Sequence, residues 1–333
     1  MAVVATGFFD GVHPGHRLVI ETLLSEARAR GEQSLVVTFW PHPRAVLQSG
    51  ADSLRYLTSR AERVEMLKAL GVDAVETIPF SREFAALSAE QYLRMLCRDY
   101  QCSALVLGYD TRFGVEQAGP EKIAALADGM GLDAVITPPV CVDGAPVSST
   151  RIRTALEAGD VALASRLLGR PYRLHGVVVP GNRLGRTIGF PTANIKLYEP
   201  LMLVPRNGVY KTTVFTANGL REETFLRKAL PPVASNGRGP QSGRGSEATS
   251  SGGTSPGANR SSYTGMTNIG VRPTVSDQKV LTIETYIFDF DEMIYGLDLT
   301  VDFISRIRDE RKFASLQDLR LQLTADAAQV SSI

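Results

Sequence analysis

The chain has 333 residues, which is enough for about two domains of ordinary size. It carries 36 basic and 35 acidic side chains, with no basic run or aromatic-studded basic stripe, so we expect no nucleic-acid partner beyond small nucleotides. Its three cysteines lack metal-type or disulfide-framework spacing, which is typical of a cytoplasmic protein. No apolar run approaches the roughly 18 residues that a membrane-spanning helix needs, so we expect no membrane partner.

Residues 1 to about 157 alternate between expected strands and helices. The apolar run 1–6 predicts a buried strand, and 17–31 predicts a helix that ends at a glycine. Such alternation predicts right-handed crossovers and a parallel sheet with helices on both faces. Ligands of such sheets bind beyond the carboxyl ends of the strands. Further strands are expected at 34–40, 74–80, 104–110 and 133–140, and further helices at 59–71, 88–100 and 120–131.

The stretch GFFDGVHPGH, residues 7–16, places two of the four histidines three residues apart at a strand-to-helix turn. The first turn of a helix presents unpaired N–H groups and the positive end of the peptide dipoles, which suits a phosphate. The glycines fit neither common phosphate-binding glycine pattern, so side chains must supply the donors, and His13 and His16 are the candidates. A structural histidine pair, or half of a zinc site with Asp10, is the alternative.

The second half of the chain has a different sequence pattern. A helix from about Thr150 to Leu168, closed by Gly169, precedes short β-rich runs separated by glycine-rich turns. These runs predict an antiparallel barrel or sandwich, followed by a helix at 315–330. Within this second half, residues 229–262 are rich in Gly, Ser and Pro, which predicts a disordered insertion.

We therefore divide the chain into a first domain at 1–157, a linker at 158–171 and a second domain at 172–330. The boundary carries helix-to-turn signals, and we expect it to lack a core shared by the two halves. Each half should then work independently.

The motifs in both halves resemble those of bacterial bifunctional riboflavin kinase/FAD synthetases. GFFDGVHPGH, WPHPRAVL, GYDTRFG and VSSTRIR occur in the order found in the adenylyl-transferring half of that family. GRTIGFPTANI, NGVYKTTV, TNIGVRPTV, IETYIFDFD and IRDERKFASLQDL resemble its riboflavin kinase half. The resemblance covers the chain except 229–262, and it implies a Rossmann-like nucleotidyltransferase domain followed by a β-barrel kinase domain. It also implies ATP and Mg²⁺ in both steps, with riboflavin and FMN as substrates.

For the first half, the resemblance implies adenylyl transfer to FMN, with His13 and His16 as the catalytic donors. Asp10 would orient one imidazole or the loop, and VSSTRIR would form a second anion site, although by itself this motif favours an ordinary helix cap. Thr111 stands where the family usually has an aromatic residue, and His42 is as compatible with a turn as with a site. The residues implied to bind nucleotide or phosphate are Gly7, Phe8, Asp10, Gly15, Ser149, Thr150 and Arg153, and those implied to bind flavin are Asp110 and Phe113.

For the second half, Glu284 matches the family's base, which takes the proton from the ribityl hydroxyl of riboflavin. Without the resemblance, Glu284 is simply a strand carboxylate, and the PTAN segment reads as a turn. Thr192 and Asn194 offer the hard oxygens that Mg²⁺ prefers. Gly185 and Arg186 would bind nucleotide, and Asn268 and Arg308 would bind flavin.

The expected function is phosphorylation of riboflavin to FMN and adenylation of FMN to FAD. Two alternatives remain at this stage. The first is a kinase with an impaired adenylyltransferase half, and the second is a non-catalytic flavin-binding regulator. The sequence leaves protein partners open.

Overall fold

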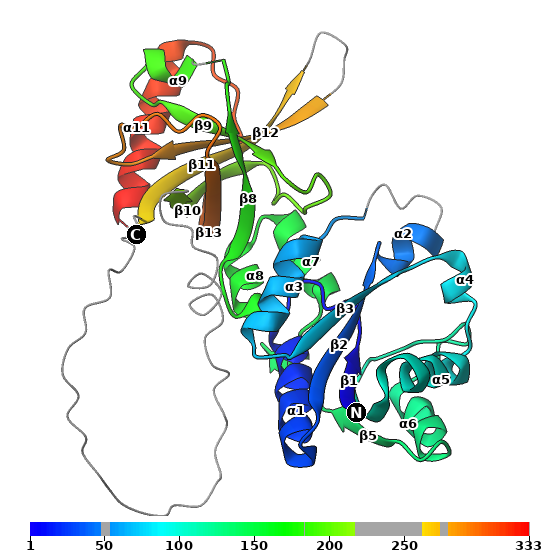
Figure 1. The fold of residues 1–333 in the computed structure, drawn as a ribbon. Coiled ribbons are helices and arrows are strands. Elements are labelled where there is room, and N and C mark those ends of the chain that lie inside the picture. Colours follow the sequence, from blue (N-terminus) through cyan, green and yellow to red (C-terminus); the bar gives the residue numbers. More distant parts are fainter. Residues whose placement is uncertain (48–53, 183, 217–261, 274–278, 333) are drawn as a thin grey trace, which may run out of the picture.

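The computed structural model describes the chain except residues 48–53, 183, 217–261, 274–278 and 333. The predicted insertion at 229–262 therefore lies outside the described residues, apart from Ser262. Figure 1 shows two bodies, one built on an open sheet near the N-terminus and one built on a barrel that ends with the C-terminal helix.

The first body is the predicted parallel sheet, which is confirmed, with strand order β3-β2-β1-β4-β5. β1 lies at its centre and pairs in parallel with both β2 and β4. The loop after β1 therefore opens at the carboxyl edge of the sheet, where ligands bind in this architecture. The strands are β1 (Ala2–Thr6), β2 (Gln33–Trp40), β3 (Ala74–Pro79), β4 (Cys102–Gly108) and β5 (Asp133–Thr137), and a short hairpin follows, β6 (Cys141–Val142) with β7 (Ala145–Pro146).

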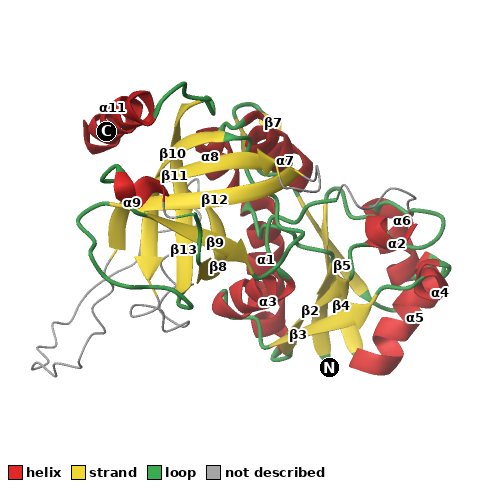
Figure 2. Ribbon diagram, turned by 90° about the horizontal axis from the view of Figure 1, so that it is seen from above, coloured by secondary structure: helices red, strands yellow, loops and turns green. Residues whose placement is uncertain are grey.

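Helices cover both faces of this sheet, as Figure 2 shows from above. On one face, α1 and α3 pack Leu23 and Leu67 against Val36 and Val106. On the other face, α5 and α6 bury residues such as Leu93 and Ile123 against alternate strand positions. Both capping boxes that begin α3 and α5 are formed. The helices are α1 (Pro14–Arg30), α2 (Pro43–Leu47), α3 (Arg60–Ala69), α4 (Arg82–Ala85), α5 (Ala89–Tyr100) and α6 (Pro120–Asp128).

The single helix expected from about Thr150 to Leu168 is wrong, because the structure divides it into α7 (Ser149–Ala158) and α8 (Val161–Leu168). Gly159 ends α7 in the left-handed conformation, with φ of 83°. The Asp160 carboxylate then accepts the N–H of Leu163 at 2.8 Å and caps α8. A glycine followed by an Asp cap ends one helix and starts the next.

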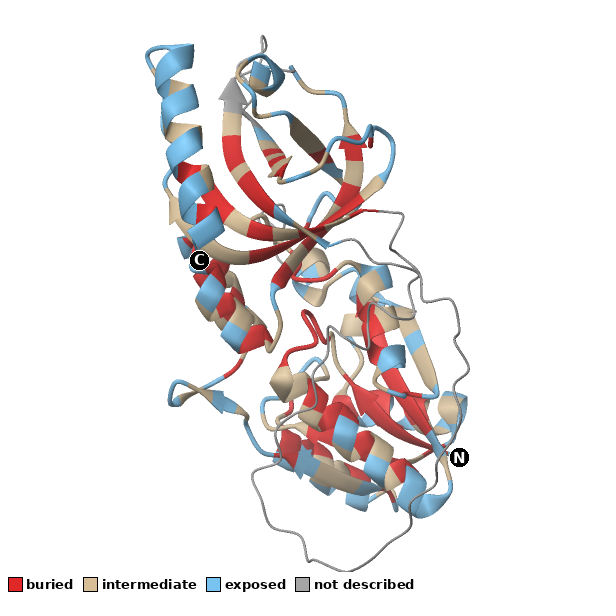
Figure 3. Ribbon diagram, turned by 90° about the vertical axis from the view of Figure 1, so that its left-hand side faces the viewer, coloured by how far each residue is buried: buried red, intermediate tan, exposed pale blue. Residues whose placement is uncertain are grey.

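The second body is a closed antiparallel barrel in the order β10-β11-β12-β9-β8-β13. The PTAN segment begins β9, so its reading as a turn is wrong. Figure 3 shows buried positions along the sheet and barrel strands, with the terminal helix α11 largely exposed. The elements are β8 (Tyr172–Val179), α9 (Leu184–Thr187), β9 (Thr192–Leu197), β10 (Gly208–Thr216), β11 (Ser262–Pro273), β12 (Lys279–Ile287), β13 (Asp298–Arg308) and α11 (Leu316–Ser332).

One hydrophobic core continues across the junction between the two bodies. It contains Tyr56 and Leu57 from the first half, the inner faces of α7 and α8, and barrel residues such as Tyr172 and Phe303. The expectation that the boundary lacks a shared core is therefore wrong. Helix capping signals report where a helix stops, but they carry no information about which surfaces pack together afterwards.

Candidate functional site

The loop between β1 and α1 has an unusual backbone. Phe9, Gly11 and Val12 have positive φ angles of 56°, 82° and 43°. A β-branched residue such as Val12 rarely adopts this conformation, and such strain occurs most often at functional sites. Val12 N donates to the Phe9 carbonyl at 3.2 Å, which closes the turn and directs the chain into α1.

His13 and His16 stack at the start of α1, with ring centroids 3.6 Å apart and planes 18° from parallel. His13 is the N-cap residue, and its Nδ1 accepts the backbone N–H of His16 at 3.4 Å. That nitrogen is therefore an acceptor, which leaves the proton of the neutral ring on Nε2 as a donor. A Cβ at Gly15 would lie 3.2 Å from the His13 ring, so this position suits a residue without a side chain.

Both imidazoles are held neutral. Burial, reinforced by the charges of Arg17 and Arg153, lowers the pKa of His13 to about 4. Burial and the neighbouring His13 lower the pKa of His16 well below its usual value. Nδ1 of His16 is buried and has no hydrogen-bond partner among the described residues. The pair is therefore suited to donating N–H groups without adding positive charge.

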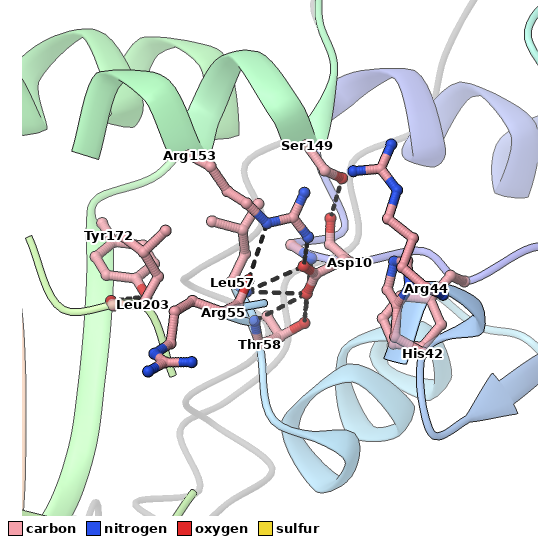
Figure 4. A network of polar contacts seen from close by, with 12 residues as sticks. Asp10, His42, Arg44, Arg55, Leu57, Thr58, Ser149, Arg153, Tyr172 and Leu203 are labelled. Carbon is pink, nitrogen blue, oxygen red and sulfur yellow. Dashed lines mark hydrogen bonds and ion pairs between the residues drawn. The ribbon is translucent and has the colours of Figure 1, made fainter. Parts of the chain in front are cut away.

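Asp10 orients the loop and not an imidazole. Its carboxylate accepts the backbone N–H groups of Leu57 and Thr58 and the Thr58 hydroxyl, each at 3.1 Å. It also forms a buried ion pair with Arg153, whose Nε donates to the Arg55 carbonyl at 2.9 Å. Figure 4 shows these contacts converging on the carboxylate. The Asp10 carboxylate is therefore already bound by protein groups. This removes Asp10 as a ligand from the alternative hypothesis of a zinc half-site.

The second motif, VSSTRIR, starts α7 beside the same loop. Ser148 is the cap, because its hydroxyl accepts the N–H of Arg151 at 3.2 Å. The Ser149 hydroxyl instead donates to the Asp10 carbonyl at 2.9 Å. The two helix starts, α1 and α7, thus lie on the same cavity, and each presents backbone N–H groups that favour an anion.

That cavity has a volume of about 340 Å³ and lies at the carboxyl edge of the sheet. Every residue predicted for the first half lines it, namely Gly7, Phe8, Asp10, His13, Gly15, His16, Asp110, Phe113, Ser149, Thr150 and Arg153. Thr111, the departure from the family, also lines it.

His42, whose role the sequence left open, lies in the same cavity. Its ring centroid is 4.2 Å from that of Phe8, and its Nδ1 accepts the N–H of Arg44 at 3.0 Å. Burial, with Arg153 and Arg44 nearby, lowers its pKa to about 3. The sequence also missed Arg44 and Arg112 as lining residues. Both lie inside quoted motifs, WPHPRAVL and GYDTRFG, but an arginine is common on any solvated surface, so nothing in the sequence marked either one as a site residue.

In the barrel, Asn194 and Glu284 occupy directly opposite positions on β9 and β12. Asn268 on β11 lies opposite Glu284 on the other side. Directly opposite residues share a face, with Cβ atoms roughly 4.5–5.5 Å apart. Three side chains predicted from separate motifs therefore lie in one row across three strands.

A second cavity of about 340 Å³ begins at this row and extends over the segment 290–295. Gly181 lies against the Asn194 amide, where an added Cβ would be 2.2 Å from Nδ2. Glu284 and Asn268 are not among the residues that line this cavity. Gly185 lies beside it, where a Cβ would be 2.2 Å from the Phe190 carbonyl oxygen. The predicted residues that line it are Arg186, Thr192 and Asn194.

Arg308 is held by the terminal helix. Its Nε donates to both carboxylate oxygens of Asp326 at 2.9 Å, and its Nη2 donates to Oδ2 at 2.7 Å. Asp326 is buried on α11, so this bidentate pair fastens the helix to β13. In this structure Arg308 contacts α11 and does not line the second cavity.

No three His, Cys, Asp or Glu side chains within the described ranges gather closely enough to hold a metal ion. None of the described helices is long and apolar enough to cross a membrane.

Known proteins resemble the chain in two successive segments. A family model for FAD synthetase matches residues 1–151, and one for riboflavin kinase matches residues 168–333. A bifunctional riboflavin kinase/FMN adenylyltransferase from Listeria monocytogenes is 34% identical over 97% of this chain and 90% of its own length. The chain belongs to this bifunctional family. The Escherichia coli member is 35% identical, with the same coverage of both chains.

One solved structure also resembles the whole chain. A protein from Streptococcus pneumoniae, titled a macrolide-efflux protein, matches with a TM-score of 0.81 and 30% identity. The match covers 100% of this chain and 94% of that one. The arrangement of sheet, junction and barrel is therefore shared with an independently solved protein.

Proposed function

We propose that the chain phosphorylates riboflavin to FMN in the barrel and transfers an adenylyl group from ATP to FMN in the sheet domain. The observation that carries this proposal is the convergence of eleven predicted side chains and glycines on one cavity beside two helix N-termini. The pairing of Asn194 with Glu284 in the barrel supports the second activity.

In adenylyl transfer, a phosphate oxygen of FMN attacks the α-phosphorus of ATP. A new P–O bond forms, the bond to the β-phosphate oxygen breaks, and pyrophosphate leaves. Negative charge builds on the oxygens around the α-phosphorus, and fixed donors at that point lower the barrier. His13, through Nε2–H, and the neutral His16 would donate such hydrogen bonds, a role that their position in the lining of the cavity supports. No covalent intermediate with the protein is required.

In the kinase step, the terminal ribityl hydroxyl of riboflavin attacks the γ-phosphorus of ATP, and ADP leaves. Glu284 accepts the proton that the hydroxyl loses. Thr192 and Asn194 would hold Mg²⁺, which neutralises phosphate charge when it is bound. The fit is supported by Gly181, because any side chain there would fill the space beside the Asn194 amide.

Phe8, Gly7 and Gly15 would shape the nucleotide site, with Asp10 and Arg153 acting through the loop. Asp110 and Phe113 would contact flavin in the first cavity. Gly185 and Arg186 would contact nucleotide in the barrel, and Asn268 and Arg308 would contact flavin there. We further propose the domain limits 1–157 and 172–330, a cytoplasmic location, and small molecules as the substrates.

A single-turnover assay with labelled ATP separates this function from its alternatives. Label on the γ-phosphate should appear in FMN, and label on the α-phosphate should appear in FAD. A kinase with an impaired first half would transfer only the γ-label, and a non-catalytic flavin binder would transfer neither.

A further inference from the structure

A short buried segment connects the adenylyl-transfer loop with the barrel. Residues 55–58, which we call the strap, lie between Asp10 and residues 201–203 of the barrel domain. Tyr56 N donates to the Leu201 carbonyl, and Leu203 N donates to the Tyr56 carbonyl, each at 2.8 Å. These two bonds form a parallel bridge centred on Tyr56 and Met202.

The opposite edge of the strap forms hydrogen bonds with the loop between β1 and α1. Leu57 and Thr58 donate their backbone N–H groups to the Asp10 carboxylate. The Thr58 hydroxyl donates to Asp10 and accepts the N–H of Gly11, both at 3.1 Å. One hydroxyl therefore fixes two consecutive residues of the strained turn that leads to His13.

Three of the four strap residues are buried, so the hydrogen bonds that they form face little competition from water. Tyr56 and Leu57 are 1% exposed and Thr58 is 3% exposed. Loss of a hydrogen-bond partner lowers the stability of the protein more when the remaining polar group is buried than when it is exposed. Thr58 is not among the residues that line the cavity, so it reaches a substrate only through Asp10 and Gly11.

The barrel holds its own side of this contact with a tyrosine. Tyr172, fully buried at the start of β8, donates its hydroxyl to the Leu203 carbonyl at 2.6 Å. Leu203 is the residue whose N–H pairs with the strap. Figure 4 shows Tyr172 and Leu203 on one side of the strap, with Asp10 and Arg153 on the other.

We propose that the strap makes the barrel a structural part of the adenylyl-transfer site, with Thr58 and Tyr172 as positioning residues for that reaction. The inference rests on the proposed adenylyl transfer and extends it beyond the residues that touch substrate. Donors act on a transition state only when they are held within a fraction of an ångström of the productive geometry. A looser strap therefore misplaces His13 and His16 without removing them.

The first test compares Thr58→Val with Thr58→Ser in the full chain. Valine keeps the shape and removes the hydroxyl, whereas serine keeps the hydroxyl. We expect valine to lower kcat for FAD formation from FMN about tenfold or more, with KM for ATP within about threefold, because the affected contacts strengthen in the transition state. Serine should restore kcat to within about twofold of the parent, and riboflavin phosphorylation should stay at the parent rate in both variants.

The second test moves to the barrel side and compares Tyr172→Phe with Tyr210→Phe. Tyr210 is also fully buried in the barrel and donates to a backbone carbonyl, that of Arg206, outside the 201–203 segment. We expect Tyr172→Phe to lower FAD formation about threefold or more while phosphorylation is unchanged. Tyr210→Phe should leave FAD formation at the parent rate.

Three results would overturn the inference. Equal kcat in the valine and serine variants of an active parent would show that the Thr58 hydroxyl positions nothing. Equal effects of the two tyrosine substitutions, or a parallel fall in both activities, would show that these residues contribute only general stability. A parent chain that forms no FAD would instead overturn the proposed function, and this inference with it.

Discussion

Asn194 on β9 lies directly opposite Glu284 on β12, so the proposed metal-binding amide and the proposed base share one face of the barrel. Neighbouring strands bring these side chains together although 90 positions of sequence separate them. The register of the sheet, set by the inward-facing Ala193 and Thr285, determines this pairing, because a slip of one residue would turn both functional side chains to the other face.

Glu284→Gln keeps the shape of the side chain and removes the proton acceptor. We expect riboflavin phosphorylation to fall by about 10²-fold or more while adenylation of supplied FMN persists. Separate assays of the two products provide the measurement. Glu292→Gln is the matched comparison, because Glu292 lines the barrel cavity. A larger loss in that variant would assign the base to Glu292 instead.

Gly181→Ala tests the fit around Asn194. The added methyl group would lie 2.2 Å from the Asn194 amide nitrogen, so the amide must move away from its position on the cavity. We expect phosphorylation to fall about tenfold, and the apparent affinity for Mg²⁺ to weaken in a titration of activity. Gly129→Ala is the control, because a Cβ there meets only carbonyl oxygens at 3.6 Å. Parent Mg²⁺ dependence in the Gly181 variant would count against a metal role for Asn194.

His16→Ala tests the donor role of the histidine pair. The loss of one donor to a developing oxyanion typically costs about 10² to 10³-fold in rate, and we expect this loss in kcat for FAD formation at saturating ATP. Riboflavin phosphorylation is the internal control. A purely structural pair would instead show a lower Tm with normal turnover, and a zinc site would lose activity on chelation.

Acid should destabilise the sheet domain through His13. Its pKa is about 4 in the folded chain, against 6.5 for an ordinary exposed histidine, so the unfolded chain takes up the proton first as the pH falls. Stability is therefore complete above pH 6.5 and decreases as the pH falls toward 4. From pH 7 to pH 5 the loss from His13 is about 2 kcal/mol.

Urea unfolding at the two pH values, followed by the fluorescence of the single tryptophan Trp40, measures this loss. His13→Gln removes the titrating group and should reduce the pH dependence by that amount. His16, with a pKa well below its usual value, and His42, with a pKa lowered to about 3, contribute in the same direction and should leave a residual slope. An unchanged slope in the His13 variant would show that the imidazole is not buried as described.

Local chemistry in the sequence predicted much of the sheet domain. Ser59 with Glu62, and Ser88 with Gln91, act within one turn of helix, so their effect is visible in a short window of sequence. The break at Gly159 was equally local, yet the apolar spacing on both sides of it favoured one continuous helix. The start of β9 was missed because a segment of Pro, Thr and Asn is typical of turns and becomes a strand only through its barrel neighbours.

For the candidate sites too, contacts between residues far apart in the chain could not be predicted from the sequence. Motif residues such as His13 and Ser149 were predicted because each motif fixes several side chains at once. Thr58 was not predicted as part of a site, because its importance arises from a hydrogen bond to Gly11, 47 positions earlier in the chain. Tyr172 looks like any buried strand residue until its partner, Leu203, is known.

The most direct test of the whole account is chromatographic identification of the flavins formed when the parent chain is incubated with riboflavin, ATP and Mg²⁺. We expect FMN to appear first and FAD to follow from it. We also expect Glu284→Gln to slow FMN formation by about 10²-fold or more. In His16→Ala, FMN should accumulate while FAD forms about 10² to 10³-fold more slowly. If riboflavin stays unchanged, or if FAD forms at the parent rate in the His16 variant, the assignment of the two activities to these two cavities is contradicted.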